Sequence, residues 1–277
     1  MPTLISSTSI GLNYEKKRWL IQANYSTTFG NSWNTATRNT ERTGAYRTEL
    51  NLYEESVIEK HNGSVGVSYK IDSTSTVTLE YQGSLADIDI NVDSKNKVFA
   101  NQFTEYNALN SGNVGILNNS IIGNYSKKID TLGSSFFIGI QHTRYNLALN
   151  EQISEDITID NISNGNKVRS INSNNAINLI SGQADFQKYL SESFSFSIGT
   201  RYSSSVNTGD LKMSTLVDDV PILVPNYSSN TEFKEQQIAG YGEFQKQIGT
   251  LKLRAGIRFE RTIADGTTTQ ANQVSLS

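Results

Sequence analysis

Apolar and polar residues alternate strictly along several segments of this chain. The clearest segment runs from 251 to 260, where the odd positions are apolar and the even positions are mostly charged. The apolar positions are Leu251, Leu253, Ala255, Ile257 and Phe259. A period of two places one set of side chains on each face of a β-strand, whereas on a helix the same residues would scatter around the axis. The pattern therefore predicts a strand.

The same alternation begins again at Trp19, Val77, Phe136 and Phe194, and each of these segments follows a short polar turn and an incoming strand. The predicted turns lie at 15–18, 71–76, 127–134, 188–193 and 245–250. Strand pairs joined by short polar turns are typical of hairpins. We therefore predict an all-β protein with five hairpins, or about ten antiparallel strands in up-and-down order.

The connections between the hairpins are long, polar and rich in Asn, Ser, Thr and Asp. They cover about 30–60, 86–111, 146–175 and 203–234. Short turns at one end and long loops at the other are typical of bacterial outer-membrane barrels, in which the turns are periplasmic and the loops extracellular. A soluble β-sandwich also alternates apolar and polar residues, but it does not explain this asymmetry. The pattern favours a segment of a transmembrane β-barrel.

Aromatic residues mark two levels on the predicted apolar face. The expected aromatic girdle consists of Tyr14, Trp19, Tyr69, Tyr125, Phe194, Tyr202, Phe244 and Phe259. The eight steps from Phe194 to Tyr202 cover roughly 26 Å of strand, or about 20 Å along the membrane normal at ~40° tilt. This height is close to the ~25 Å apolar band of such barrels, which aromatic residues flank on both sides.

The composition is consistent with a barrel and excludes several other classes. The mean hydropathy is −0.43, and no run approaches the ~18 apolar residues of a spanning helix. A barrel keeps a low average hydropathy because lipid-facing and lumen-facing residues alternate. The chain has no cysteine, which excludes disulfides and thiolate sites, and its net charge of −3 gives no reason to expect a nucleic-acid partner.

Two stretches carry a resemblance to a known family. They are 233–241 (FKEQQIAGY) and 251–262 (LKLRAGIRFERT), with further matches at 182–186 and 11–14. The chain resembles the barrel portion of TonB-dependent receptor-like proteins of the Bacteroidetes type, often called the outer membrane protein β-barrel family. The resemblance implies an outer-membrane location, a plug inside a barrel of about 22 strands, and energy from the TonB system. Outer-membrane lipid, the remaining strands, the plug and, indirectly, TonB are the expected partners.

The chain departs from the complete family pattern at both ends. The start, MPTLI, has no signal-peptide pattern, and 267–277 reads as a polar loop and not as a closing aromatic strand. No plug segment is recognised. We therefore expect residues 1–277 to form a single partial barrel domain, an internal fragment of the wall.

The predicted lumen-facing charges are Lys252, Arg254, Arg258 and Glu260. In a receptor they would contact the plug or an anionic substrate, or they would pair with charges on neighbouring strands. No nucleophile, Walker or dinucleotide motif is present, so we predict no catalytic residue, no cofactor and no enzyme.

Three other candidates for chemistry have structural interpretations. His142 falls on the lipid-face parity, and His61 is expected to begin the third strand near the outer rim; both are interpreted as structural. Asp87, Asp89 and Asp93 share one face of an extended segment and are a weak candidate for a calcium site. The favoured interpretation is a strand that continues above the membrane with a solvated acidic face.

The functional hypothesis is the barrel wall of a TonB-dependent receptor that imports a nutrient, whether sugar, siderophore or peptide. One alternative is a self-contained small barrel that acts as an adhesin or carries an enzyme site at its rim. The other is a soluble β-rich surface protein.

Overall fold

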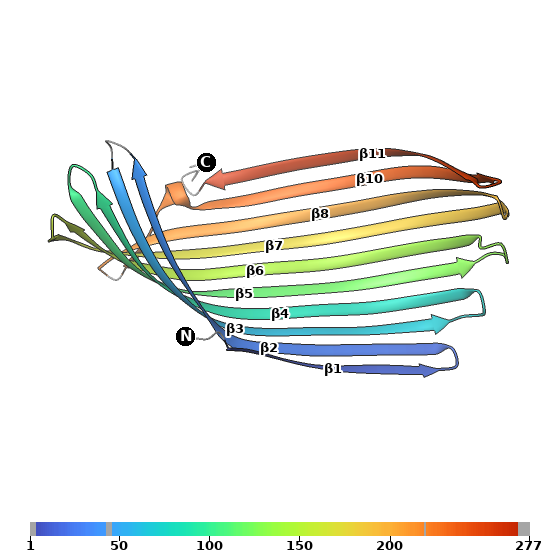
Figure 1. Cartoon of the computed structure of the whole chain (residues 1–277), viewed down its shortest axis with the longest axis horizontal. Helices are drawn as coiled ribbons and strands as arrows, with labels where there is room; N and C mark the ends of the chain where they lie inside the picture. The colour runs from blue at the N-terminus through green and yellow to red at the C-terminus, as the bar shows by residue number, and fades with distance from the viewer. Residues whose placement is uncertain (1–3, 43–45, 219, 271–277) are drawn as a thin grey trace, which may run out of the picture.

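The computed structural model describes residues 4–42, 46–218 and 220–270, and they are almost entirely strand (Figure 1). The strands are β1 (Leu4–Lys16), β2 (Trp19–Arg42), β3 (Tyr46–Lys70), β4 (Ser75–Phe99), β5 (Phe103–Lys128), β6 (Ser135–Ile159), β7 (Ile162–Ser191), β8 (Phe194–Val217), β9 (Val220–Leu223), β10 (Ser229–Ile248) and β11 (Leu251–Gln270). A short 3-10 turn, η1 (Pro225–Tyr227), precedes β10. In these ranges no helix is long and apolar enough to span a membrane.

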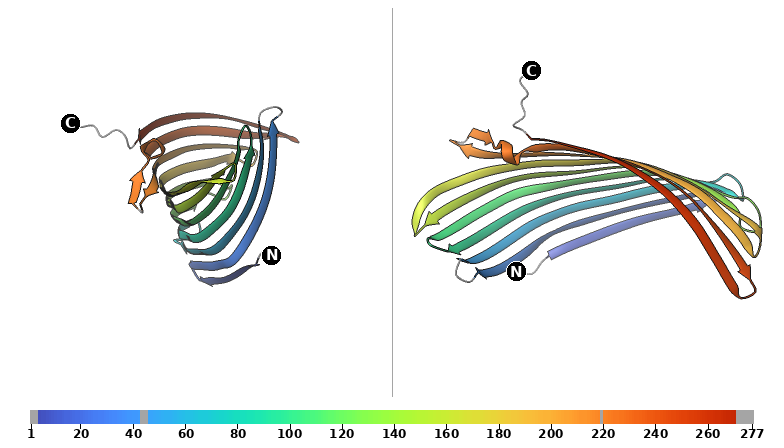
Figure 2. Two further views of the ribbon diagram at one scale, coloured as in Figure 1. Left: turned by 90° about the vertical axis from the view of Figure 1, so that its left-hand side faces the viewer. Right: turned by 90° about the horizontal axis from the view of Figure 1, so that it is seen from above.

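All strands belong to one antiparallel sheet in which each main strand pairs with the next. The order is β1-β2-β3-β4-β5-β6-β7-β8-β10-β11, and the short β9 pairs with β8. The sheet twists and curves into an open trough (Figure 2). Over the described residues β1 and β11 do not pair with each other, so each leaves one edge of the sheet open. The predicted up-and-down all-β architecture is confirmed.

The five predicted turns are all present, and each is shorter than expected. The tightest leave two residues between strands, as at Lys17–Arg18 and Gly249–Thr250. Lys17 and Gly249 adopt φ values of 53° and 59°, as reversals this tight require.

The long connections differ from the expectation. They are largely strand, because β4 and β5 pair up to Phe99 and Phe103, and β6 and β7 pair up to Ile159 and Ile162. Polar residues there still alternate with Val, Ile and Leu, and the continued ladder satisfies the backbone groups. The expected polar loop at 267–277 is also wrong in part, since β11 extends to Gln270; 271–277 lie outside the described residues.

The sheet has almost no apolar core of its own. Among the described residues the buried apolar side chains are Ala86, Ile157 and Ala239. Large apolar residues are instead exposed on one face, for example Leu12 at 61%, Ile140 at 63% and Ile198 at 55%. A continuous apolar face of this extent requires an apolar environment.

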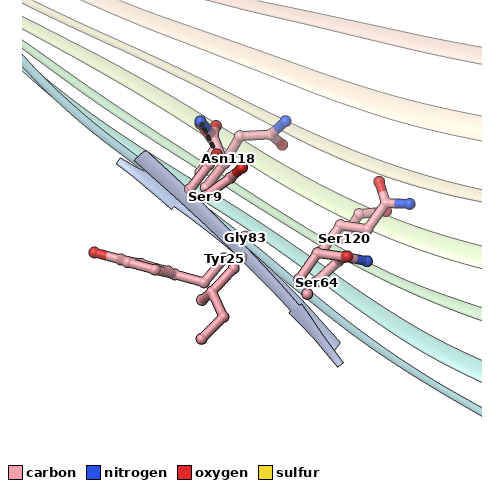
Figure 3. Close-up of a pocket in the computed structure, with 14 residues that line it drawn as sticks. Ser9, Tyr25, Ser64, Gly83, Asn118 and Ser120 are labelled. Carbon is pink, nitrogen blue, oxygen red and sulfur yellow. Dashed lines mark hydrogen bonds between the residues drawn. The ribbon is translucent and has the colours of Figure 1, made fainter. Parts of the chain in front are cut away.

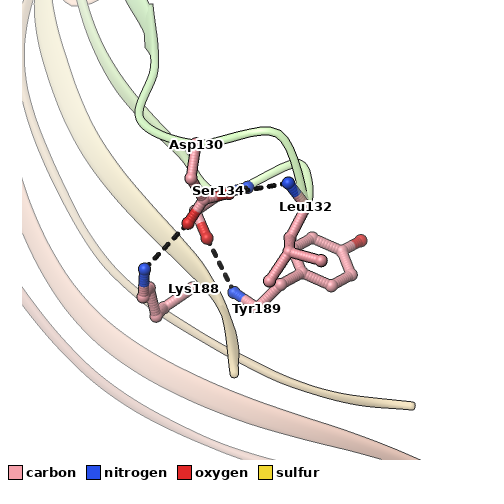
Figure 4. Close-up of polar contacts among 5 residues, drawn as sticks. All are labelled: Asp130, Leu132, Ser134, Lys188 and Tyr189. Carbon is pink, nitrogen blue, oxygen red and sulfur yellow. Dashed lines mark hydrogen bonds and ion pairs between the residues drawn. The ribbon is translucent and has the colours of Figure 1, made fainter. Parts of the chain in front are cut away.

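Aspartate side chains fix two of the short turns. Asp130 accepts the backbone N–H groups of Leu132 (3.1 Å) and Ser134 (3.0 Å), and its other oxygen pairs with Lys188 Nζ at 2.8 Å (Figure 4). The Lys188 ammonium and the Ser134 donors hold the pKa of Asp130 well below its usual range. Asp72 accepts the N–H groups of Thr74 (2.7 Å) and Ser75 (2.8 Å).

These hydrogen bonds predict how the β3–β4 turn responds to acid. Bonds from Thr74 and then Ser75 lower the pKa of Asp72 from 3.8 to about 2. A depressed pKa means that the stabilisation is complete above pH 3.8 and is lost as the pH falls through about 2. Amide exchange at Thr74 and Ser75 should therefore accelerate only in that window. Asp72→Ala, which removes the acceptor, should show fast exchange without the acid step; an unchanged acid step in this variant would contradict the assignment.

Candidate functional site: the two faces of the sheet

The two faces of the trough carry different chemistry over its first five strands. Polar side chains line a shallow hollow of about 400 Å³ on the inner side. In Figure 3, Ser9, Ser64, Asn118 and Ser120 point to this side, and Tyr25 points to the opposite one. The outer side carries Leu12, Ala23, Val65 and Tyr81, among others. The lining of this hollow is thus rich in hydroxyl and amide groups, and none of its residues is charged.

The predicted lumen-facing charges lie together on one face of the last strand, β11, the face that is the inner one in the sheet. Arg254 Nε pairs with Glu243 Oε2 at 2.7 Å, and Arg258 Nη2 pairs with Glu260 Oε2 at 2.7 Å. Gln237 Nε2 donates to the other Glu260 oxygen at 2.5 Å. Lys252 lies opposite Gln247 in the ladder. Pairing with a charge on a neighbouring strand, one of the two roles considered for these residues, is therefore present for Arg254, whereas Arg258 and Glu260 pair with each other within β11.

A cross-strand contact that the sequence did not reveal lies beside these charges. Tyr241 of β10 and Asp185 of β7 flank Gly199 of β8 in register, and the Tyr241 hydroxyl donates to Asp185 Oδ1 at 2.5 Å across the glycine. A Cβ built on Gly199 would lie 2.4 Å from the Tyr241 ring. Arg258 lies 5.5 Å from the centre of the same ring. The signal in the sequence was a single glycine in a run of alternating serines, which only the register makes informative.

The apolar face changes sides toward the long hairpin ends. Ile58, Ile88, Val114 and Leu149 form one continuous row across β3 to β6, on the parity that is polar nearer the turns. The opposite face at this level carries Asp87 and Asp89. This inversion limits the outward-facing apolar band to the part of the sheet between it and the short turns.

The acidic cluster has a local explanation. Asn113 Nδ2 donates to Asp87 and also to Asp89, the latter at 2.9 Å. No group of three potential metal ligands forms within the part of the chain that the structure describes. Asp93 lies farther along β4, which continues to Phe99 as an extended strand with an exposed acidic face.

The expected girdle residues all occupy strand positions whose side chains lie on the apolar face. Trp19 and Tyr69 are cross-strand partners with ring centroids 4.5 Å apart, and Tyr125 lies 6.4 Å from Phe136. Tyr14, Phe194 and Phe244 lie near the turns on the same face, whereas Tyr202 and Phe259 lie farther along their strands. Their contact with the membrane interface stays a prediction.

His61 is not at the start of the third strand, as expected, but in the middle of β3, which begins at Tyr46. Its Nδ1 lies 2.7 Å from the Tyr25 hydroxyl and its Nε2 2.8 Å from Glu59 Oε1. The polar segment before it is strand and not loop, because it pairs with β2 on one side and β4 on the other. His142 lies between Ile121 and Ile180 in the ladder.

Comparison with known proteins agrees with this geometry. The model of the outer membrane protein beta-barrel family matches residues 127–276, more than half of the chain. The chain belongs to this family. As a member of the outer membrane protein β-barrel family, it is located in the bacterial outer membrane.

No curated protein matches this family member. Among solved structures it is similar to the Ralstonia pickettii toluene transporter TbuX, with 8% identity over 95% of this chain and 86% of that one and a TM-score of 0.27. The ferric yersiniabactin uptake receptor FyuA from Yersinia pestis is 8% identical over 94% of this chain, with a TM-score of 0.26, and the match covers 54% of that receptor.

Proposed function

We propose that the chain forms part of the wall of a TonB-dependent outer-membrane receptor that imports a nutrient ligand. One observation carries the proposal: a single curved sheet with an apolar outer face, a polar inner face and two open edges. The outer face is suited to acyl chains and the inner face to an aqueous passage. In this proposal residues 1–277 are one partial barrel domain, and the short turns are periplasmic.

The inner face offers two kinds of contact to a plug or a passing solute. The first five strands present hydroxyl and amide groups, and the last strands present paired charges around Arg258 and Glu260. Because these arginine and glutamate side chains are paired, they leave little net electrostatic field. This part of the wall would therefore neither attract nor repel an ionic ligand strongly. Substrate capture then falls to the long hairpin ends, and gating to the plug.

In this proposal more strands pair with the two open edges and complete the wall. Each edge strand in a bilayer would leave backbone N–H and C=O groups without partners, which costs several kcal/mol per group in lipid. β1 and β11 each have one neighbour among the described strands. The alternative, a self-contained small barrel, requires them to pair with each other.

Engineered cysteines distinguish these two possibilities, because the chain has none of its own. In the full-length protein Asn13→Cys, combined in turn with Arg254→Cys and Arg258→Cys, should give no intramolecular disulfide on mild oxidation. Asn13→Cys with Gln22→Cys is the positive control, since these residues are direct partners in the β1–β2 ladder. Efficient cross-linking between β1 and β11 would favour the small barrel.

Uptake by cells tests the transport role. The proposal predicts that cells with the protein deplete at least one large solute from a mixed nutrient medium, and that cells lacking the protein do not. Depletion should stop when the inner membrane is de-energised or TonB is removed. Depletion that survives both treatments would indicate a passive pore, and equal depletion without the protein would contradict a role in import.

A further inference from the structure

Four of the five incoming strands end on the same arrangement of an aromatic residue followed two positions later by a lysine. The pairs are Tyr14 and Lys16, Tyr125 and Lys127, Phe186 and Lys188, and Phe244 and Lys246. Because side chains two apart share a face, each lysine lies on the apolar outer face, between its aromatic neighbour and the short turn. β3 is the exception, since Lys70 has the opposite parity.

The ladder places a second aromatic ring directly opposite each of these lysines. The cross-strand partners are Trp19 for Lys16, Phe136 for Lys127, Phe196 for Lys188 and Phe194 for Lys246. Lys246 Nζ lies 5.3 Å from the centre of the Phe194 ring. Each lysine is therefore flanked by two rings at the end of the apolar band, and we call this repeated arrangement the lysine–aromatic belt.

Acidic partners are scarce on this face. Lys188 pairs with Asp130 of the neighbouring turn, whereas Lys16, Lys127 and Lys246 make no ion pair with any residue that the structure describes. Glu15, beside Lys16 in the sequence, has the inner parity and lies 3.6 Å from Lys70. Three positive charges thus lie without an ion-pair partner on the outer face, at the end of the apolar band nearest the short turns.

We propose that the lysine–aromatic belt binds the headgroups of anionic phospholipids in the leaflet that meets the short turns. Long lysine side chains keep their stems in apolar surroundings and extend the ammonium to the interface. Amphipathic rings favour the same level, and an anionic headgroup supplies the missing countercharge. The inference rests on the proposed lipid contact of the outer face.

Spin-labelled lipids test two claims separately: that the outer face contacts lipid, and that the belt binds anionic headgroups. The measurement uses the full-length protein reconstituted in phosphatidylcholine vesicles. A motionally restricted fraction of labelled phosphatidylcholine reports lipid contact with the protein. Selectivity for labelled phosphatidylglycerol over phosphatidylcholine reports the belt, and we expect it to exceed twofold on average, given roughly fivefold per lysine contact. The selectivity should decline with added salt.

Variants locate the effect. Lys127→Gln with Lys246→Gln should remove at least half of the phosphatidylglycerol selectivity. The matched control, Lys128→Gln with Lys252→Gln, removes the same charge from the inner parity of the same hairpins and should leave the selectivity unchanged.

The outcomes separate the two steps. A motionally restricted fraction that favours neither lipid would contradict headgroup binding by the belt, but it would still support lipid contact of the outer face. Equal losses in both double variants would also overturn it, because a general charge effect would then suffice. No restricted fraction for either lipid would contradict the proposed facing itself.

Discussion

Replacing Ile198 by arginine should destabilise the membrane-inserted protein by about 2–4 kcal/mol. Ile198 lies midway between Phe194 and Tyr202 on the apolar face, and 55% of its surface is exposed. A guanidinium at this level must either lose its hydration or draw water and headgroups into the bilayer. The free energy of unfolding from vesicles, measured by denaturant titration of tryptophan fluorescence, gives the cost directly.

Ser197→Arg is the matched control for this change. Ser197 adjoins Ile198 in β8, has the opposite parity and lies across from Glu243 of β10. An arginine there would enter an aqueous lumen beside a carboxylate, so we expect a change of less than about 1 kcal/mol. Similar costs for both variants would contradict the assignment of the two faces, and a larger cost for Ser197→Arg would reverse it.

Strand alternation and turn position were predictable because both depend on short-range chemistry. A period of two is visible in the residues from Leu251 to Phe259 alone, and the polar residues of a tight turn interrupt it. The same rule failed in the long connections. A hairpin that extends into water can carry polar side chains on both faces and still form its backbone hydrogen bonds. Polar composition therefore does not distinguish a loop from an extended hairpin there.

The parts of the site that the sequence did not reveal depend on register. Tyr241, Gly199 and Asp185 are separated by 42 and 14 positions, and nothing in their local sequence says that they are neighbours. The lysine–aromatic belt is partly visible as a repeated spacing, but the ring opposite each lysine comes from another strand. The inversion of the apolar face likewise appears only when four strands are aligned.

The contact across Gly199 predicts the second large effect. Gly199→Ala should lower the free energy of unfolding by about 1–3 kcal/mol, because the new Cβ would lie 2.4 Å from both the Tyr241 ring and Asp185 Oδ1. The ring must move, and its hydrogen bond to Asp185 is then lost. Backbone strain does not contribute, since Gly199 is not among the described residues with positive φ.

Two further variants isolate the cause. Gly240→Ala, on the neighbouring strand, should be nearly neutral because a Cβ there meets no atom within 4 Å. In a Tyr241→Ala background the penalty of Gly199→Ala should largely vanish, because Asp185 is then free to turn away. A coupling energy of about 1 kcal/mol or more between the two positions is therefore expected from the double-mutant cycle. Additive effects would mean that the alanine destabilises β8 by another route, and that Tyr241 does not bridge β7 and β10 across the glycine.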